Sequence, residues 1–367
     1  MKSVASRDAP MFRVRHMDRS SRFGLALWTV LLIGLAALPF SGDRQTMRLL
    51  TEVYSYVALA SLWNLLAGYA GLVSIGQQVF VGVGGYTLYL GALSAGLPPL
   101  LCIPLAAVLC GALAVPIVLL LFRLRGAYFT IGSWVIAELF VQISQQVRAV
   151  GGGSGISLPA SVVKSIAQSR DAREFLIYWL FLAMVVIVIG LIVIILRTRH
   201  GLALTAIRDN EMAAKSNGIE VNRTRLIVFV SAAAASGMAG ALIFLQKLSI
   251  TPFSAFSIND WTINVIFITV IGGIGRVEGP IVGAIIFFVL REFLADYGSV
   301  YLVILGMVAI IVMLRARRGI WGYLADRYGW QLFPLARRLE RVGASANTAV
   351  EHDGAPASSQ PGRALEV

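Results

Sequence analysis

Charged and polar side chains that could bind a partner gather in residues 197–225, between two long apolar stretches. Glu211 and Lys215 stand four residues apart, a spacing that makes a favourable ion pair on one side of a helix. Asn217-Gly218, followed by an isoleucine, is typical of a helix C-terminus with glycine in the left-handed conformation. Residues of these types are suited to binding a partner rather than to catalysing a reaction. We therefore predict a short helix that inserts into a groove of another protein.

One face of this segment would be apolar if it formed a single helix. The side chains on that face are Leu202, Ala206, Met212 and Ala213, with Ile207 near its edge. Arg208 joins Glu211 and Lys215 on the polar side. The alternative to a protein partner is an interfacial helix that rests on lipid headgroups, which bind amphipathic helices of this kind.

Few ionisable side chains interrupt the apolar stretches. They are Glu52, Glu138, Asp260, Arg291, Glu292 and Asp296. Charges at such positions usually face a cavity or a partner group, because hydrocarbon solvates them poorly. Glu138 is the most central, and two interpretations stay open for it: a structural ion pair or hydrogen bond, and a place on a transport path or gate. A proton relay is not indicated, since no series of acids and histidines accompanies it.

Signatures of catalysis are missing from the sequence. The dipeptide Gly-Lys does not occur, so the chain has no phosphate-binding loop of the Walker A type. His16, His200 and His352 have no spacing typical of a metal site. No Gly-x-Ser-x-Gly turn presents a nucleophile. We expect no enzymatic activity and no cofactor or metal bound by this chain.

The composition is that of a membrane protein. Of 367 residues, 57% are hydrophobic and 14% are charged, whereas a soluble domain has about 25% charged residues. The apolar stretches predict an all-α polytopic bundle of about ten transmembrane helices. Their expected ranges are 23–40, 49–67, 78–95, 98–122, 127–144, 175–196, 226–246, 259–274, 280–296 and 299–314.

The distribution of basic residues predicts the orientation. With the N-terminus inside, the cytoplasmic segments hold 23 of the 31 Lys and Arg residues, as the positive-inside rule requires. This clustering reports topology and gives no indication of nucleic-acid binding. We expect a basic tail at 1–22, a membrane domain at 23–314 and a second cytoplasmic tail at 315–367, disordered after about residue 343.

Two glycine-rich connectors interrupt the helices on the expected cytoplasmic side. Their glycines are Gly68, Gly71 and Gly76 in the first, and Gly272, Gly273 and Gly275 in the second. Transporters often break helices where the backbone lines a cavity, which makes these residues candidates for the transport path or its gate. The alternative is that small residues let helices pack closely.

A long outer segment at 145–174 also contains a glycine cluster. Four glycines in five positions at 151–155 do not form a stable helix. The segment is either a flexible connector or a surface for an external partner or the mouth of a pore.

Several strings, in a consistent order, resemble known permeases. Glu211-x-Ala-Ala-x-x-x-Gly218 resembles the EAA loop of ABC importer permeases. The longer string at 206–219 looks like the branched-chain amino acid permeases of the LivM type. So do the strings at 64–77, 123–129, 151–156 and 272–283. The resemblance covers roughly residues 45–322.

The resemblance implies a bacterial inner-membrane permease with an ABC importer fold and both termini cytoplasmic. It implies a homologous second permease subunit, two cytosolic ABC ATPases that use ATP, and a periplasmic binding protein. A cytoplasmic coupling helix would lie in residues 203–219. Its ATPase-coupling residues would be Arg208, Asp209, Glu211, Ala213, Ala214 and Gly218.

The substrate stays open at this point. Ala127 stands where the family often has an acidic residue, and Gln77-Gln78 replaces a small or histidine-containing pair. Relatives of this type also serve urea, short amides and aromatic acids. A self-sufficient secondary transporter is an alternative, but the sequence offers few coupling-ion residues at mid-membrane. A membrane enzyme acting on a lipid-linked substrate would need a catalytic cluster in a loop, which the sequence lacks.

Overall fold

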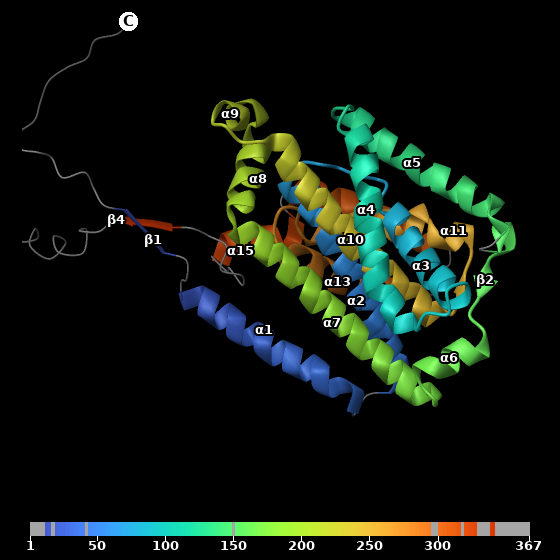
Figure 1. The fold of residues 1–367 in the computed structure, drawn as a ribbon. Coiled ribbons are helices and arrows are strands. Elements are labelled where there is room, and N and C mark those ends of the chain that lie inside the picture. Colours follow the sequence, from blue (N-terminus) through green and yellow to red (C-terminus); the bar gives the residue numbers. More distant parts are fainter. Residues whose placement is uncertain are drawn as a thin grey trace, which may run out of the picture.

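The computed structural model describes residues 12–15, 19–40, 43–148, 151–294, 300–316, 319–328 and 338–341. These residues are mostly helical, and the long helices pack into one bundle (Figure 1). The predicted disorder after residue 343 lies outside the described residues. The longer helices are α1 (Arg19–Ala37), α2 (Arg44–Asn64), α3 (Gln78–Leu93), α4 (Pro99–Leu121), α5 (Ala127–Gln146), α7 (Arg170–Arg197), α10 (Val221–Lys247), α13 (Gly279–Leu294) and α14 (Val300–Arg315).

Shorter helices connect or extend these elements. They are α6 (Ala160–Ile166), α8 (Arg199–Asp209), α9 (Glu211–Ser216), α11 (Pro252–Ala255), α12 (Asn264–Gly272) and α15 (Gly319–Tyr328). A π-helical turn, η2 (Leu65–Tyr69), continues α2, and a second, η5 (Asn259–Ile263), precedes α12. The described residues of each expected apolar range are mostly helical, while the number of membrane crossings stays a prediction.

Six helical segments are long and apolar enough to cross a membrane. They are Arg44–Tyr69, Pro99–Leu121, Ala127–Gln146, Arg170–Arg197, Val221–Lys247 and Pro252–Gly272. Two shorter helical segments, Trp28–Phe40 and Gln78–Leu93, are also apolar. The length and composition of these helices support a multi-pass membrane protein of the helical class.

Two helices occupy the centre of the bundle. In the most apolar 18-residue window, 78% of the residues are buried in Arg44–Tyr69 and 67% in Val221–Lys247. The corresponding values for α4, α5 and α7 are 33%, 28% and 39%. These three helices therefore turn much of their apolar surface outward, where lipid or another membrane subunit must cover it.

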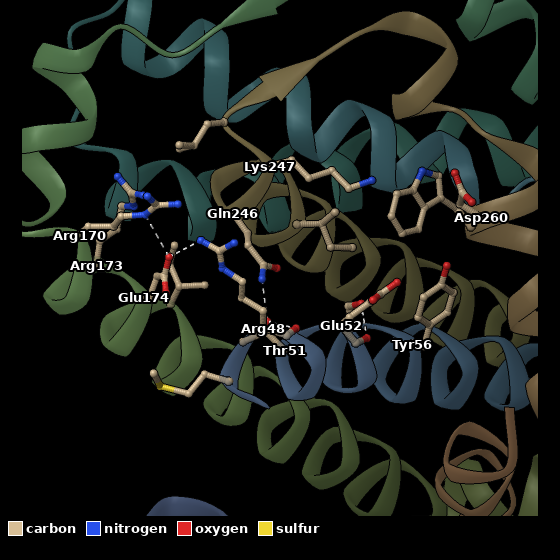
Figure 2. A pocket seen from close by; sticks show the side chains of 16 residues that line it. Arg48, Thr51, Glu52, Tyr56, Arg170, Arg173, Glu174, Gln246, Lys247 and Asp260 are labelled. Carbon is tan, nitrogen blue, oxygen red and sulfur yellow. Dashed lines mark hydrogen bonds and ion pairs between the residues drawn. The ribbon is translucent and has the colours of Figure 1, made fainter. Parts of the chain in front are cut away.

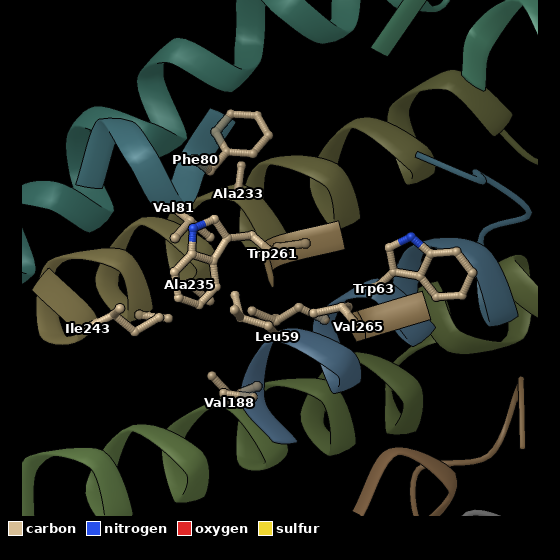
Figure 3. Close-up of a cluster of buried hydrophobic side chains, with 14 of the residues drawn as sticks. Leu59, Trp63, Phe80, Val81, Val188, Ala233, Ala235, Ile243, Trp261 and Val265 are labelled. Carbon is tan, nitrogen blue, oxygen red and sulfur yellow. The ribbon is translucent and has the colours of Figure 1, made fainter. Parts of the chain in front are cut away.

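The central core is built from large side chains of α2 and η5 packed on small residues of α10. Leu59 of α2 and Ala235 of α10 lie near Trp261 (Figure 3), while Trp63 of α2 and Ala233 of α10 lie in other parts of the same cluster. All five are nearly or fully buried. Small residues on one helix let the large residues of its neighbours approach closely, as is usual for helix pairs in membranes.

Glycines set the separation of α3 and α10. A Cβ at Gly84 would lie 2.0 Å from the carbonyl oxygen of Gly237, and one at Gly240 would lie 2.0 Å from that of Val81. No atom can occupy these positions unless the two backbones move apart. The contact explains why α10 carries glycines in its interior, where their conformational freedom otherwise weakens a helix.

We expect Gly240→Ala to lower the thermal unfolding midpoint of the purified protein, because overpacking of this kind costs about 1–3 kcal/mol. Gly190→Ala is the matched control, since Gly190 also lies within a long helix but has no atom within 4 Å of its Cβ position. The control should match or slightly exceed the wild type, because alanine favours a helix. Equal midpoints for the two variants would show that the α3–α10 contact tolerates a methyl group.

Two short strand pairs tie distant parts of the chain together. β1 (Phe12–Arg15) pairs antiparallel with β4 (Arg338–Arg341), so segments near the two termini lie side by side. β2 (Ile156–Ser157) pairs antiparallel with β3 (Ser249–Ile250) just after α10.

The glycine-rich segment after α5 is ordered against the end of α10. Besides the β2–β3 pair, the backbone N–H of Leu158 donates to the carbonyl of Leu248 at 3.1 Å. Gly155 has φ 78°, and a Cβ there would lie 2.3 Å from the carbonyl oxygen of Ile250. Glycine is required by this close approach. These contacts hold residues 155–158 against the end of α10, and the role of the segment as a surface for an external partner or a pore mouth stays a prediction.

Candidate functional site

Residues 197–225 form two helices rather than the single helix predicted from sequence. α8 ends at Asp209 and α9 begins at Glu211, with Asn210 extended between them at φ −158° and ψ 106°. The Asn210 side-chain oxygen accepts a hydrogen bond from the backbone N–H of Ala213 at 3.0 Å. Asparagine is a favoured N-cap because its oxygen satisfies a free N–H of the first turn. The cap therefore starts a new helix and bends the chain.

This bend makes the predicted apolar face wrong. Leu202 and Met212 are 50% and 74% exposed, whereas Ile207 and Ala214 are each 2% exposed. Ile207, Ala214 and Val221 form a small apolar cluster of their own. The physical reason is that α8 and α9 do not share one helical phase. Met212 and Ala213 are left facing outward at the turn between the helices.

Glu211 lies at the centre of the polar contacts here. Its carboxylate accepts from Lys215 Nζ at 2.7 Å and from Arg225 at 2.9 Å. The hydrogen bond from Lys215 lowers the pKa of the Glu211 carboxyl; the charge and hydrogen bond of Arg225 act in the same direction, and partial burial opposes them. The predicted Glu211–Lys215 pair is confirmed. Gly218 has φ 79° and follows the end of α9, as predicted.

Two arginines contact the first glycine connector: Arg208 of α8, and Arg225 at the start of α10, which also binds Glu211 of α9. Arg208 donates to the carbonyl of Gly68 at 3.3 Å, and Arg225 donates through Nε to the carbonyl of Ala70 at 3.2 Å. Both acceptors lie where η2 ends the long helix that begins with α2. Asp209, beside Arg208, is 72% exposed and has its carboxylate 3.5 Å from the Arg208 Nε. A displacement of α8 and α9 would therefore pull directly on the end of α2.

The two glycine connectors meet at the same place. Asn64 accepts a hydrogen bond from the backbone N–H of Gly275 and donates one to the carbonyl of Arg276, both at 2.8 Å. A Cβ at Gly68 would lie 2.6 Å from the Gly275 nitrogen. Asn64 is 2% exposed, so these hydrogen bonds are shielded from water. Sequence analysis did not single out Asn64, although it opens one of the strings that carry the resemblance.

The other connector glycines also allow close backbone contact. A Cβ at Gly76 would lie 2.4 Å from the Ser133 carbonyl oxygen, and one at Gly272 would lie 1.8 Å from that of Gly279. Gly71 and Gly273 have φ 68° and 134°. Close packing accounts for these positions. Their role in a path or gate stays a prediction.

Glu138 faces outward from α5. It is exposed, and the hydrogen bond that its carboxylate accepts comes from Gln142 on the same helix, at 3.1 Å. Its neighbours Trp134, Val135 and Leu139 are about half exposed. Glu138 thus lies on an apolar outer face of the chain and away from the connectors.

A cavity of about 520 Å³ lies among the first turns of α2 and α7, the last turn of α10 and the start of η5. We call the bend formed by α8 and α9 (residues 199–216) the α8–α9 corner. The cavity lies at the start of α7 and the α8–α9 corner follows the end of α7, so the two lie at opposite ends of the bundle (Figure 1). Its charged lining residues are Arg48, Glu52, Arg170, Arg173, Glu174, Lys247 and Asp260 (Figure 2). Glu52, which lines this cavity, pairs with Arg291 of α13 at 2.6 Å, so both of these ionisable residues face a partner group.

Apolar helices of spanning length, joined at one end by a buried polar contact, define the chain as a multi-pass helical membrane protein. A family model described as the permease component of branched-chain amino acid transport systems matches residues 45–314. The chain belongs to this family and is a permease subunit of an ABC importer.

Known relatives agree with this family. The chain is 28% identical to the high-affinity branched-chain amino acid transport system permease protein LivM of Escherichia coli, over 87% of this chain and 80% of that protein. It is 27% identical to the protein of the same name from Salmonella typhimurium, with the same coverage. A shorter match, 31% identical over 37% of this chain and 44% of the relative, is to the ribose import permease protein RbsC of Bacillus subtilis. No solved structure matches this chain.

Proposed function

We propose that this subunit forms part of the membrane path for branched-chain or related amino acids. A second, homologous permease subunit would complete the path, two cytosolic ABC ATPases would drive it, and a periplasmic binding protein would deliver the solute. The names of the LivM relatives support the substrate class. The observation that carries the mechanism is the α8–α9 corner. It is bonded to the first connector directly through Arg208, and indirectly through the Glu211–Arg225 ion pair with α10.

In the proposed mechanism the α8–α9 corner docks on an ATPase. Met212 and Ala213 are exposed at its turn, next to the carboxylate of Glu211. An apolar side chain beside a charge that is held in place suits insertion into a groove. ATP would be bound by the partner, since this chain carries no Walker A loop.

Closure of the ATPases would then move the end of α2 through the two arginine contacts. Asn64 would pass this movement to residues 275–276, between α12 and α13, because it bonds both connectors. A shift at the corner would thereby tilt several helices together. Such transmission needs elements with two discrete arrangements, and the glycine connectors are the proposed hinges.

We further propose about ten membrane crossings with both termini cytoplasmic. The basic residues concentrate in segments that this topology places inside. The β1–β4 pair supports it, because strands near the two termini must then lie on one side of the membrane. In this orientation the α8–α9 corner is cytoplasmic and the large cavity opens toward the periplasm.

The outward face of α5 is the proposed contact with the second permease subunit. Glu138 lies near the middle of this apolar helix, and a carboxylate exposed to hydrocarbon is costly. Packing of a partner subunit on this face would remove Glu138 and Gln142 from lipid and place them at the boundary between the subunits, where a transport path would run.

Uptake in proteoliposomes tests the proposed function. We expect the full complex to accumulate radiolabelled L-leucine only with the binding protein outside and ATP inside, because the chain carries no ATP site of its own. Unlabelled isoleucine and valine should compete, while urea, acetamide and phenylacetate should not. Competition by one of the latter three would assign the alternative substrate class. Uptake driven by an ion gradient without ATPases would identify a secondary transporter and overturn the proposal.

A further inference from the structure

The large cavity is lined by helical faces of regular spacing. α2 contributes Arg48, Glu52 and Tyr56, each four residues from the next. α10 contributes Ile243 and Lys247, also four residues apart. Residues at this spacing lie on one side of a helix. Several helices therefore turn a polar stripe toward the same space at the end of the bundle where the proposed topology places the periplasm.

Several charges around the cavity are paired within the chain. Glu174 pairs with Arg48 and with Arg170, and Glu52 is bonded by Arg291 at 2.6 and 3.4 Å. These pairs form part of the wall. Arg48 and Arg170 both contact the same oxygen of Glu174, and its other oxygen has no hydrogen-bond partner among the described residues.

Three charged groups that line the cavity, Arg173, Lys247 and Asp260, have no ionic partner among the described residues. Arg173 lies beside Arg170 on α7, away from the other two (Figure 2). Lys247 contacts aromatic rings: its Nζ lies 4.8 Å from the centroid of the Trp261 ring and 5.7 Å from that of Phe244. The carboxylate of Asp260 has neither a hydrogen bond nor an ion pair with the part of the chain that the structure describes. Lys247 and Asp260 lie on the same side of the cavity (Figure 2), and no ion pair joins them.

The same region offers an apolar wall. Trp261 is 3% exposed and Ile243 is 4% exposed, and both line the cavity. Tyr56 is buried beside them, with its ring 6.3 Å from the Trp261 ring. A cavity of this size with apolar walls and a few convergent polar groups is typical of a site for a small molecule.

We propose that this cavity is a binding site for a zwitterionic α-amino acid with an apolar side chain. The ligand carboxylate pairs with Lys247, the ligand ammonium pairs with Asp260, and the side chain packs on Trp261 and Ile243. An α-amino acid carries both charges on groups bonded to one carbon, so it can bind a cation and a carboxylate that line the same cavity. This inference rests on the proposed amino-acid substrate and adds a site within the permease subunit.

A phosphatidylethanolamine headgroup shares part of this chemistry, because it also joins an ammonium to an anionic oxygen. The structure favours the amino acid, since the apolar wall beside the two charges would accept a side chain that the headgroup lacks. Lipid composition is therefore varied in the test.

Equilibrium binding of radiolabelled L-leucine tests the site. The full transporter complex is placed in nanodiscs of phosphatidylcholine, without binding protein and without nucleotide. We expect saturable binding, with 4-methylpentanoate and isoamylamine, which each lack one charge, competing at least about tenfold less well than leucine, as loss of a charge-assisted hydrogen bond implies.

The two variants have distinct signatures. Asp260→Asn should weaken leucine binding at least about tenfold and remove the preference for leucine over 4-methylpentanoate, because the ammonium loses its carboxylate. Lys247→Met should weaken binding similarly and remove the preference over isoamylamine. The matched controls are Asp171→Asn and Lys164→Met, which change exposed residues outside the cavity. They should bind leucine as the wild type does.

Three outcomes would overturn the site. These are the absence of saturable binding, equal loss in variants and controls, and displacement of leucine by phosphatidylethanolamine in the nanodiscs, which would identify a lipid site. If the complex imports leucine without such binding, the site fails and the proposed function stands. If leucine binds as expected but uptake assays show another solute, the site stands and the proposed substrate fails.

Discussion

Replacing Glu211 by lysine is expected to reduce ATP-driven uptake to background while the subunit still reaches the membrane. The substitution places a third cation beside Lys215 and Arg225, whose charges Glu211 now neutralises at 2.7 and 2.9 Å. Repulsion among the three cations would separate α9 from α10. The lysine would also present a positive charge to the ATPase where the wild type presents a negative one. The ATPase should then hydrolyse ATP without driving transport. Uptake of leucine and ATP hydrolysis, measured on the same proteoliposomes, would show this uncoupling.

Matched substitutions separate docking from local folding. Glu220→Lys changes a carboxylate that is 69% exposed and pairs with Arg223, so it should leave uptake near the wild-type level. Glu211→Gln removes the charge without adding repulsion, and we expect an intermediate loss. Uptake by the Glu211→Lys variant equal to that of the wild type would exclude the α8–α9 corner as the drive contact.

The positions of the helices and part of the corner could be predicted from sequence. Apolar runs fix where a helix forms in a membrane protein, because the backbone must satisfy its own hydrogen bonds there. The Glu211–Lys215 pair and the role of Gly218 depend only on neighbours within a few residues. The residues next to them in the sequence are therefore enough to predict both features.

The break at Asn210 and the exposure of Glu138 could not be predicted in the same way. Asparagine is only weakly unfavourable within a helix, and its capping role depends on the chain turning there. α5 is apolar on most sides, so its sequence does not say which face packs on the bundle. Which side of such a helix is covered is decided by its neighbours.

The cavity is a product of tertiary structure alone. Lys247 and Asp260 belong to different elements, and Arg48 and Glu174, which form an ion pair, are 126 residues apart in the chain. No short motif joins them. The polar residues at helical spacing near the start of α2 were a usable signal, because four-residue spacing of Arg48, Glu52 and Tyr56 already indicates a shared face.

Asn64→Leu is expected to lower both the thermal unfolding midpoint and the rate of uptake. Leucine has a similar size but bonds neither the N–H of Gly275 nor the carbonyl of Arg276, which now meet the Asn64 side chain at 2.8 Å each. Leaving a buried polar group unsatisfied costs about 1–3 kcal/mol. The two connectors would also lose the contact that makes them move together, so uptake should fall more than stability alone explains.

A comparison with Asn64→Asp isolates the contact that transmits movement. Aspartate still accepts a hydrogen bond from the N–H of Gly275 but, when ionised, repels the carbonyl of Arg276. One of the two hydrogen bonds between Asn64 and residues 275–276 is therefore lost. We expect uptake per folded transporter to rank wild type, then Asn64→Asp, then Asn64→Leu. Asn222→Leu, which changes an exposed amide, is the matched control and should leave uptake unchanged. If Asn64→Leu unfolds earlier but each folded transporter works at the wild-type rate, Asn64 stabilises the connectors without coupling them, and the ATPase must act through α10 instead, along the Arg225 contact.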